Sequence, residues 1–195
     1  MKNELIHSRR SMLGTMGGSM LSVAAIGVLG NTSVAHAMNH HEGDASGDVA
    51  ILNVALGLEH EAIAAYQIGA ESGLLEKGVL DVAVLFQGHH KGHRDALIGA
   101  IESMGGSPVE SKSTETYVAE LDIANTVKGQ ADVLKLARKL ERGAANAYLG
   151  VIPSFMDSGL KQISGRLAAD EATHWALLNN ALGDAYPSDP LIFGG

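Results

Sequence analysis

The sequence has no cysteine among its 195 residues. This absence excludes disulfides, thiolate zinc sites and thiol catalysis, so any metal ion must be bound by His, Asp or Glu. Aromatic residues make up only 4% of the chain and proline occurs 4 times, whereas 46% of the residues are apolar and 24 are glycine. Such a balance favours closely packed helices over a β-sandwich, and the length fits one domain.

Basic residues and an apolar stretch mark the N-terminal segment as an export signal. Lys2, Arg9 and Arg10 precede a glycine-interrupted apolar segment at 12–30, and Ala-His-Ala at 35–37 is a small-x-small cleavage site. The paired arginines, in the context Ser-Arg-Arg-Ser-Met-Leu, resemble a twin-arginine signal. The alternatives are a Sec signal or an uncleaved anchor. We expect an exported protein of the periplasm or cell envelope.

Acidic residues outnumber basic residues by 22 to 14, which gives a net charge of −8. Cleavage after the signal peptide, residues 1–37, removes three basic residues and one acidic residue, so the mature chain is more negative still. A chain with this charge is not expected to bind nucleic acid or an anionic membrane surface. No apolar run after the signal reaches the length of a membrane span, so we expect none in the mature protein.

Apolar residues at three- and four-residue spacing, interrupted by Gly and Pro, predict four long helices. These helices are expected at 48–70, 75–104, 129–151 and 158–182. The connections within the first and second pairs are short, whereas the chain between the pairs is long. Two hairpins joined by a long crossover resemble the way in which the helices of a ferritin-like bundle are connected.

The segments around the helices complete the predicted organisation. A polar linker at 38–47 precedes the bundle at 48–185, and an irregular tail follows at 186–195. Asp48 is a candidate N-cap of the first helix. Within the crossover, 117–127 is expected to form a short extra helix or to extend the third long helix.

Two segments of the chain repeat one pattern. Residues 58–66 and 140–148 both read Leu-Glu-x-x-Ala-x-x-Ala-Tyr. Glu and Tyr stand seven residues apart in each segment and therefore share one helix face, which is otherwise apolar. A carboxylate on a buried face is costly unless it is paired or binds a metal ion. A single glutamate of this kind usually lies at the edge of the apolar face and reaches water. Glu59 and Glu141 occupy matching positions in the repeat, which favours a functional role for both.

Each repeated segment is followed by a helix that carries histidine. Glu171 and His174 are three residues apart and stand on one face, where they can bind metal together. When His93 is aligned with His174, His90 occupies the place of Glu171. His89 and His93, four residues apart, offer a second spacing that presents two imidazoles to one ion. A solvated, histidine-rich helix turn is the alternative.

Each of the other polar residues nearby allows two interpretations. His60 and Glu61 lie outside the repeat, so we interpret them as surface residues or as neighbours of the ligands. Asp170 is either a neighbour of the ligands or simply exposed. Tyr66 and Tyr148 can donate hydrogen bonds to ligand carboxylates or relay electrons, although an ordinary place in the core is the commoner role.

Six residues together resemble the sites of the ferritin-like superfamily, in which two helices supply one Glu each and two supply Glu-x-x-His. They are Glu59, His90, His93, Glu141, Glu171 and His174. The resemblance covers about 48–182. Within the superfamily, the chain is similar in particular to small exported ferritin-like proteins of bacteria. It implies an all-α four-helix bundle that binds two iron or manganese ions and carries out redox chemistry with oxygen or peroxide.

One departure from the family concerns His90, which stands where a bridging Glu is usual. Three carboxylates would leave about one positive charge on two divalent cations. The site is therefore a histidine-rich two-metal centre, a single-metal site or a degenerate remnant. We expect an oxidoreductase that uses the two metals; the alternative is a non-enzymatic envelope protein that buffers metal or serves as a scaffold. By analogy with exported bundles, a homodimer is expected.

A second metal site is predicted at the mature N-terminus. Cleavage after Ala37 leaves a chain that starts Met38-Asn39-His40. A free amine with His at the third position can bind copper(II) or nickel(II) in a square plane. Chance placement of His40 is the alternative.

Overall fold

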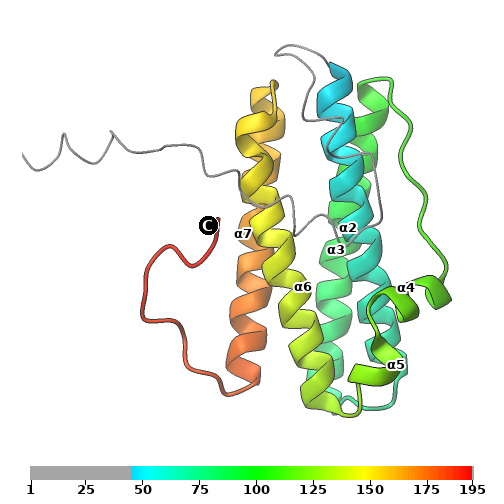
Figure 1. Ribbon diagram of the computed structural model, residues 1–195, viewed down its shortest axis with the longest axis vertical. Coiled ribbons are helices and arrows are strands. Elements are labelled where there is room, and N and C mark those ends of the chain that lie inside the picture. The colour runs from blue at the N-terminus through cyan, green and yellow to red at the C-terminus, as the bar shows by residue number, and fades with distance from the viewer. Residues whose placement is uncertain (1–44, 195) are drawn as a thin grey trace, which may run out of the picture.

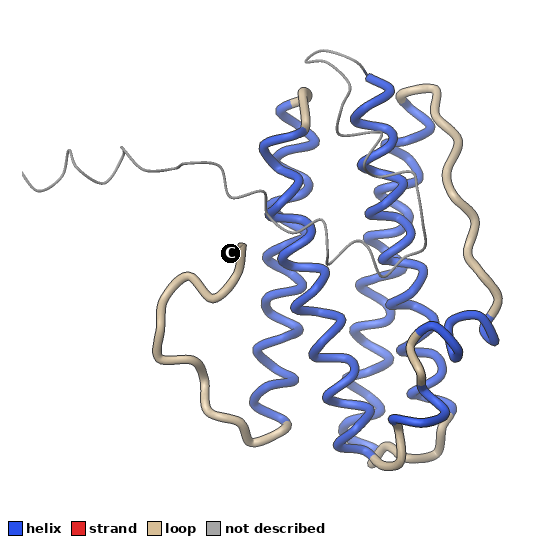
Figure 2. Tube along the Cα trace, viewed as in Figure 1, coloured by secondary structure: helices blue, strands red, loops and turns tan. Residues whose placement is uncertain are grey.

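The computed structural model describes residues 45–194, and over this range the protein is all-α, as predicted (Figures 1 and 2). Four long helices form the bundle: α2 Ala45–Glu71, α3 Lys77–Ser103, α6 Gln130–Val151 and α7 Ser158–Ala181. The crossover contains two short helices, α4 Thr114–Glu120 and α5 Ile123–Thr126, and one 3-10 turn, η2 Ile152–Ser154, precedes α7. The predicted signal peptide and the copper or nickel site at His40 lie outside the described residues.

The bundle consists of two helical hairpins. Helix α2 packs mainly on α3 and helix α6 mainly on α7, while contacts between α2 and α6 join the hairpins. The crossover runs along the outside of the first hairpin before it enters α6 (Figure 1). The predicted long connection between two hairpins is therefore present.

The beginning of α2 differs from the prediction. The helix starts at Ala45, so residues 45–47 are helical and Asp48 is not the N-cap. Asp48 is instead buried, and its carboxylate accepts hydrogen bonds from the backbone N–H groups of Met156 and Asp157 at 3.1 and 3.3 Å. Asp48 thus holds the chain just before α7 against the first turn of α2.

The ends of the other helices follow local chemistry. Asp157 caps α7, because its carboxylate accepts a hydrogen bond from the N–H of Leu160 at 2.9 Å. Helix α3 ends before Gly105, whose φ of 75° is favourable for glycine. Between α4 and α5, Asp122 has a left-handed φ of 52°, so the short helix expected at 117–127 is divided in two.

The crossover is attached to α2 by side chains of that helix. The Asn53 amide donates to the carbonyl of Ser107 at 3.1 Å and accepts from the N–H of Val109 at 2.8 Å. His60 Nε2 lies 3.1 Å from the carbonyl oxygen of Val109. His60 therefore binds the crossover rather than the predicted metal ligands.

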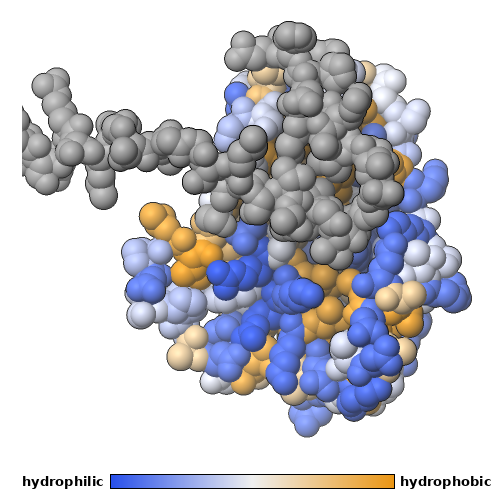
Figure 3. Space-filling model, viewed as in Figure 1, coloured by the Kyte–Doolittle hydropathy of each residue, from blue (hydrophilic) through white to orange (hydrophobic). Residues whose placement is uncertain are grey.

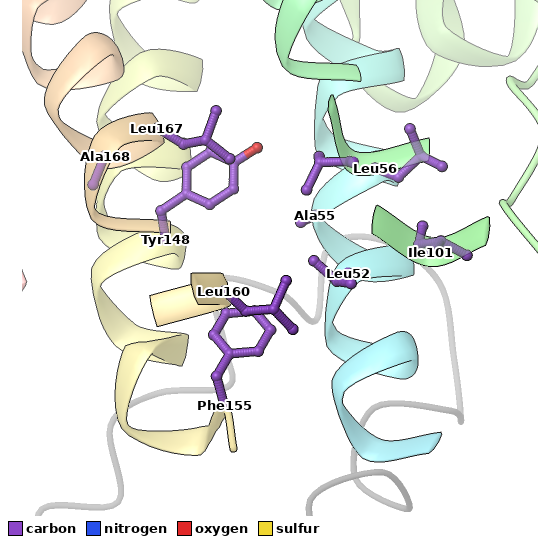
Figure 4. Close-up of a cluster of buried hydrophobic side chains, with 10 residues drawn as sticks. Leu52, Ala55, Leu56, Ile101, Tyr148, Phe155, Leu160, Leu167 and Ala168 are labelled. Atoms are coloured by element: carbon purple, nitrogen blue, oxygen red, sulfur yellow. The ribbon is translucent and has the colours of Figure 1, made fainter. Parts of the chain in front are cut away.

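Two apolar clusters fill the bundle at its opposite ends. The cluster in Figure 4 lies where α2 and α7 begin and includes Leu52, Leu56, Ile101, Tyr148, Leu160 and Leu167. A second cluster, made of Tyr66, Ala83, Phe86, Leu134 and Leu178, lies toward the ends of α2 and α7. The polar residues predicted to bind metal come from the middle of the helices, between these clusters.

Helix α2 is a candidate membrane span by its length and composition. From Ser46 to Glu71 it is long and apolar enough to cross a membrane by length and composition, with a mean hydropathy of 1.2 in its most apolar window. Core helices of soluble bundles have the same length and composition, and α2 packs on both α3 and α6.

Candidate metal centre

The six side chains singled out by the repeat lie together inside the bundle. One group of potential ligands contains Glu59, His90, His93 and Glu171, and the other contains His90, Glu141, Glu171 and His174. Within each group, one ligand atom of every residue lies within 4.8 Å of the others, and all six residues are buried. His90 and Glu171 belong to both groups, as the sequence alignment of the two halves predicts for the bridging positions. That these residues bind metal stays a prediction.

His90 lies between the two outer carboxylates. Its Nδ1 is 2.8 Å from Glu59 Oε2, and its Nε2 is 3.2 Å from Glu141 Oε1. Burial alone lowers the pKa of His90, but the hydrogen bonds to Glu141 and Glu59 outweigh it and raise the pKa to about 11. In the metal-free protein His90 is therefore an imidazolium that connects α2 to α6.

The other two histidines direct Nδ1 into the site. His93 Nδ1 lies 3.0 Å from Glu171 Oε1, and His174 Nδ1 lies 3.1 Å from Glu171 Oε2. Burial lowers the pKa of His93, but its contacts with Glu171 and Glu59 have the larger effect and raise the pKa to about 10. Burial also opposes the charged form of His174, but its carboxylate neighbours Glu141 and Glu171 raise its pKa.

The carboxylates respond in opposite directions to this environment. Burial raises the pKa of Glu141, but hydrogen bonds from His174 and His90 dominate and hold the pKa below its ordinary value. The same balance lowers the pKa of Glu59. At Glu171 burial prevails and, together with its hydrogen bond to Glu141, raises the pKa. Imidazolium groups next to the three carboxylates offset their charge.

The outer nitrogens of the two terminal histidines are also held. His93 Nε2 lies 3.2 Å from Asp170 Oδ2, and His174 Nε2 lies 2.9 Å from His89 Nδ1. Asp170 is thus a neighbour of a predicted ligand. His89 does not join His93 in one group, contrary to one of the two spacings considered, but contacts His174. Asp170 directly precedes Glu171, and His89 directly precedes His90, the two residues that belong to both ligand groups. The matching positions of Asp170 and His89 in the repeat are the sequence signal for their similar roles.

Tyr66 and Tyr148 cross between the repeated segments. The Tyr66 hydroxyl donates to Glu141 Oε1, and the Tyr148 hydroxyl donates to Glu59 Oε1. Burial and the nearby carboxylates raise the pKa of both phenols well above the ordinary value, so they remain donors. The tyrosines are core residues, and they also orient predicted ligands.

Two nearby features were not identified from the sequence. The Phe86 ring stacks on His174 with 4.1 Å between ring centroids. Phe86 lies four residues before His90, one turn away on the same face, which is the only sequence signal for it. Glu61 is buried rather than a surface residue, and burial raises its pKa.

A groove of about 850 Å³ connects the surface to the centre. It lies between α2, α6 and the α4–α5 region, and its lining includes Glu61, His90, Glu141 and apolar residues such as Leu140. On the face shown in Figure 3, hydrophobic side chains are exposed among hydrophilic ones in the half that carries α5. The groove therefore reaches the outer side of His90 and Glu141, which are themselves 1% exposed.

The donor atoms fit a metal ion. His93 Nδ1 and Glu171 Oε1 are buried and have no hydrogen-bond partner within the described part of the chain, although they are only 3.0 Å apart. Both atoms point at each other and at no other hydrogen-bond partner, so they can bind one common ion once the proton of His93 is displaced. Imidazole and carboxylate without thiolate suit iron, manganese or zinc.

Comparison with known proteins agrees with the fold. Residues 47–184 match the model of the ferritin-like domain family. The chain therefore belongs to that family. A crystal structure of a conserved hypothetical protein from Mycobacterium tuberculosis is similar, with a TM-score of 0.62 and 24% identity over 72% of this chain and 100% of that chain. This likeness shows the fold alone. No curated protein matches the sequence.

Proposed function

We propose that the protein is an exported metalloprotein that binds two iron or manganese ions and reacts with oxygen or peroxide. The observation that carries the proposal is the pair of overlapping ligand groups, which share His90 and Glu171. A shared carboxylate between two sets of ligands is the arrangement of two-metal sites in four-helix bundles. Iron or manganese would supply one-electron redox changes and open positions for a small oxidant.

The residues around the centre prepare it for this role. Tyr66 and Tyr148 fix the outer carboxylates, while Asp170 and His89 fix the outer nitrogens of His93 and His174. Such contacts orient the ligands, and a carboxylate acceptor such as Asp170 also raises the basicity of the imidazole that donates to it. The groove admits ions and a small oxidant at the side of His90 and Glu141.

Export through the twin-arginine route supports the same proposal. That route carries folded proteins, so the metal ions can be acquired before export. Replacement of both Arg9 and Arg10 by lysine should leave the protein in the cytoplasm, whereas a Sec signal would tolerate the change. Cell fractionation followed by immunoblotting distinguishes the two results.

A second candidate is a metal buffer without turnover. It is favoured by His90, which replaces a carboxylate and so leaves the centre with one negative charge less than the usual set. Zinc or copper would then be retained by the same side chains, with no redox reaction.

Oxygen consumption separates the two functions. Ferrous iron is added without air to the metal-free protein, and oxygen is then admitted. The redox proposal expects rapid uptake by the wild type and by Glu102→Ala, an exposed control on α3, and loss of uptake in Glu171→Ala. Metal binding without oxygen uptake would support the buffer and contradict the redox proposal.

A further inference from the structure

An apolar cavity lies beside the candidate metal centre, at the end of the bundle where α2 turns into α3. Its volume is about 230 Å³, and all four long helices and α5 line it. Its lining residues include Ala65, Gly78, Ala83, Leu134, Ala137 and Leu178. It is distinct from the groove, although Leu136 and Leu140 border both.

The cavity offers no free hydrogen-bonding side chain. Of its lining residues, only Ser72 and Tyr66 carry a polar side-chain group. The Ser72 hydroxyl donates to the carbonyl of Gly69 at 2.6 Å, and the Tyr66 hydroxyl donates to Glu141. A charged or strongly polar occupant would lose its hydration without compensation. The occupant must therefore be apolar and uncharged.

Small residues keep this space open. A Cβ atom at Gly78 would meet nothing within 4 Å, so the space next to Gly78 is empty. A Cβ atom at Gly69 would lie 3.1 Å from a side-chain atom of Val133, so Gly69 is closely packed. Ala83 and Ala137 stand on opposite walls, where leucine side chains would occupy the space. Protein interiors are usually filled, and an engineered cavity of about 150 Å³ already holds benzene.

The wall nearest the metal centre consists of residues that hold its ligands. Tyr66 donates to Glu141, and Phe86 stacks on His174. The Tyr66 and Phe86 rings meet edge to face at 6.2 Å. An occupant of the cavity would therefore contact the side chains that position two predicted ligands.

We propose that this cavity binds one small, uncharged apolar molecule, of the size of a two-ring aromatic hydrocarbon or a chain of about eight carbons. This inference goes beyond the proposed metal chemistry and does not depend on it. Apolar contact with the walls and the release of water from them supply the binding free energy.

Equilibrium dialysis with naphthalene tests the proposal. The wild-type chain and the control Ala96→Leu, which places leucine on the exposed face of α3, should bind one naphthalene per chain with the same affinity. Ala83→Leu and Ala137→Leu fill the cavity from opposite walls and should weaken binding by about ten-fold or more.

Several results would overturn the inference. They are an absence of saturable binding to the wild type and equal affinity in a folded filled variant. If one filled variant fails to fold by circular dichroism, the other decides. Glu59→Gln changes a predicted ligand that does not line the cavity, so it should lose metal and retain naphthalene binding. Failure of the metal proposal would thus be distinguishable from failure of this one.

Discussion

His90 determines the charge of the centre at the scale of single residues. It supplies an imidazolium between Glu59 and Glu141, which offsets part of their charge in the absence of metal. A carboxylate in its place would bring four acidic groups together. The family pattern of four carboxylates is therefore more dependent on bound cations than the set in this chain.

The substitution His90→Glu should consequently destabilise the metal-free protein by about 3–5 kcal/mol, because it removes a buried cation and adds a buried anion. Saturating manganese(II) should reduce the difference in the free energy of unfolding between His90→Glu and the wild type, since two divalent cations balance four carboxylates. Urea unfolding with and without chelator measures both quantities. Gln162→Glu, which adds a carboxylate to the exposed face of α7, is the control. Equal stability of His90→Glu and wild type without metal would contradict this role of His90.

Protonation of the histidines predicts the pH dependence of the centre. The pKa values of His93 and His90 are raised to about 10 and about 11, so both are charged at neutral pH without metal. Their stabilisation is complete below the ordinary pKa of about 6.5 and is lost as the pH rises through 10 and 11. The metal-free protein should therefore lose stability progressively from about pH 7 to pH 11.

Metal binding has the opposite dependence on pH, because ions must displace these protons. The apparent affinity for manganese(II) should rise from pH 6 to 9, with release of about two protons per chain. Calorimetric titration in buffers of different ionisation enthalpy measures the release. Affinity that does not change with pH would show that the histidines are not ligands.

At the scale of helices, the tyrosines connect the two hairpins. Tyr66 of α2 reaches Glu141 of α6, and Tyr148 of α6 reaches Glu59 of α2. Tyr148→Phe leaves a buried carboxylate without its donor and should lower the free energy of unfolding by about 1–3 kcal/mol. Tyr66→Phe should cost a similar amount, because the repeat places both in matching positions. Tyr186→Phe on the exposed tail should change nothing, and chemical denaturation compares the three. Unchanged stability of both core variants would refute the link.

Helix boundaries show what the sequence can and cannot predict. Residues Gly105 and Asp157 mark the ends of α3 and α7 because their chemistry is local. Asp48 looks like a helix cap for the same local reason, yet its partners are Met156 and Asp157, more than one hundred residues away. Local patterns do not contain such partners.

Asp48 offers a direct test of that long-range contact. Asp48→Ala removes the acceptor of two backbone N–H groups before α7 and should lower the free energy of unfolding by about 0.5–2 kcal/mol. Asp189→Ala in the exposed tail is the control. Urea denaturation midpoints compare the variants, and an unchanged midpoint for Asp48→Ala would show that the contact does not contribute.

At the scale of the whole molecule, internal duplication made the centre predictable. Two copies of one hairpin, each with a Glu and a histidine motif, must meet around an approximate two-fold arrangement when the hairpins pack together. The register of the repeat therefore identified all six buried residues. The cavity and the groove could not be foreseen, because they depend on how closely the helices approach each other in space.

The number of metal ions in protein exported by its native host decides whether the duplicated centre works as proposed. Native mass spectrometry combined with elemental analysis should find about two iron or manganese ions per wild-type chain, and fewer than half as many in folded Glu171→Ala, since Glu171 belongs to both ligand groups. A folded wild-type chain that carries no metal, and that gains none when iron or manganese is added, would contradict the proposal.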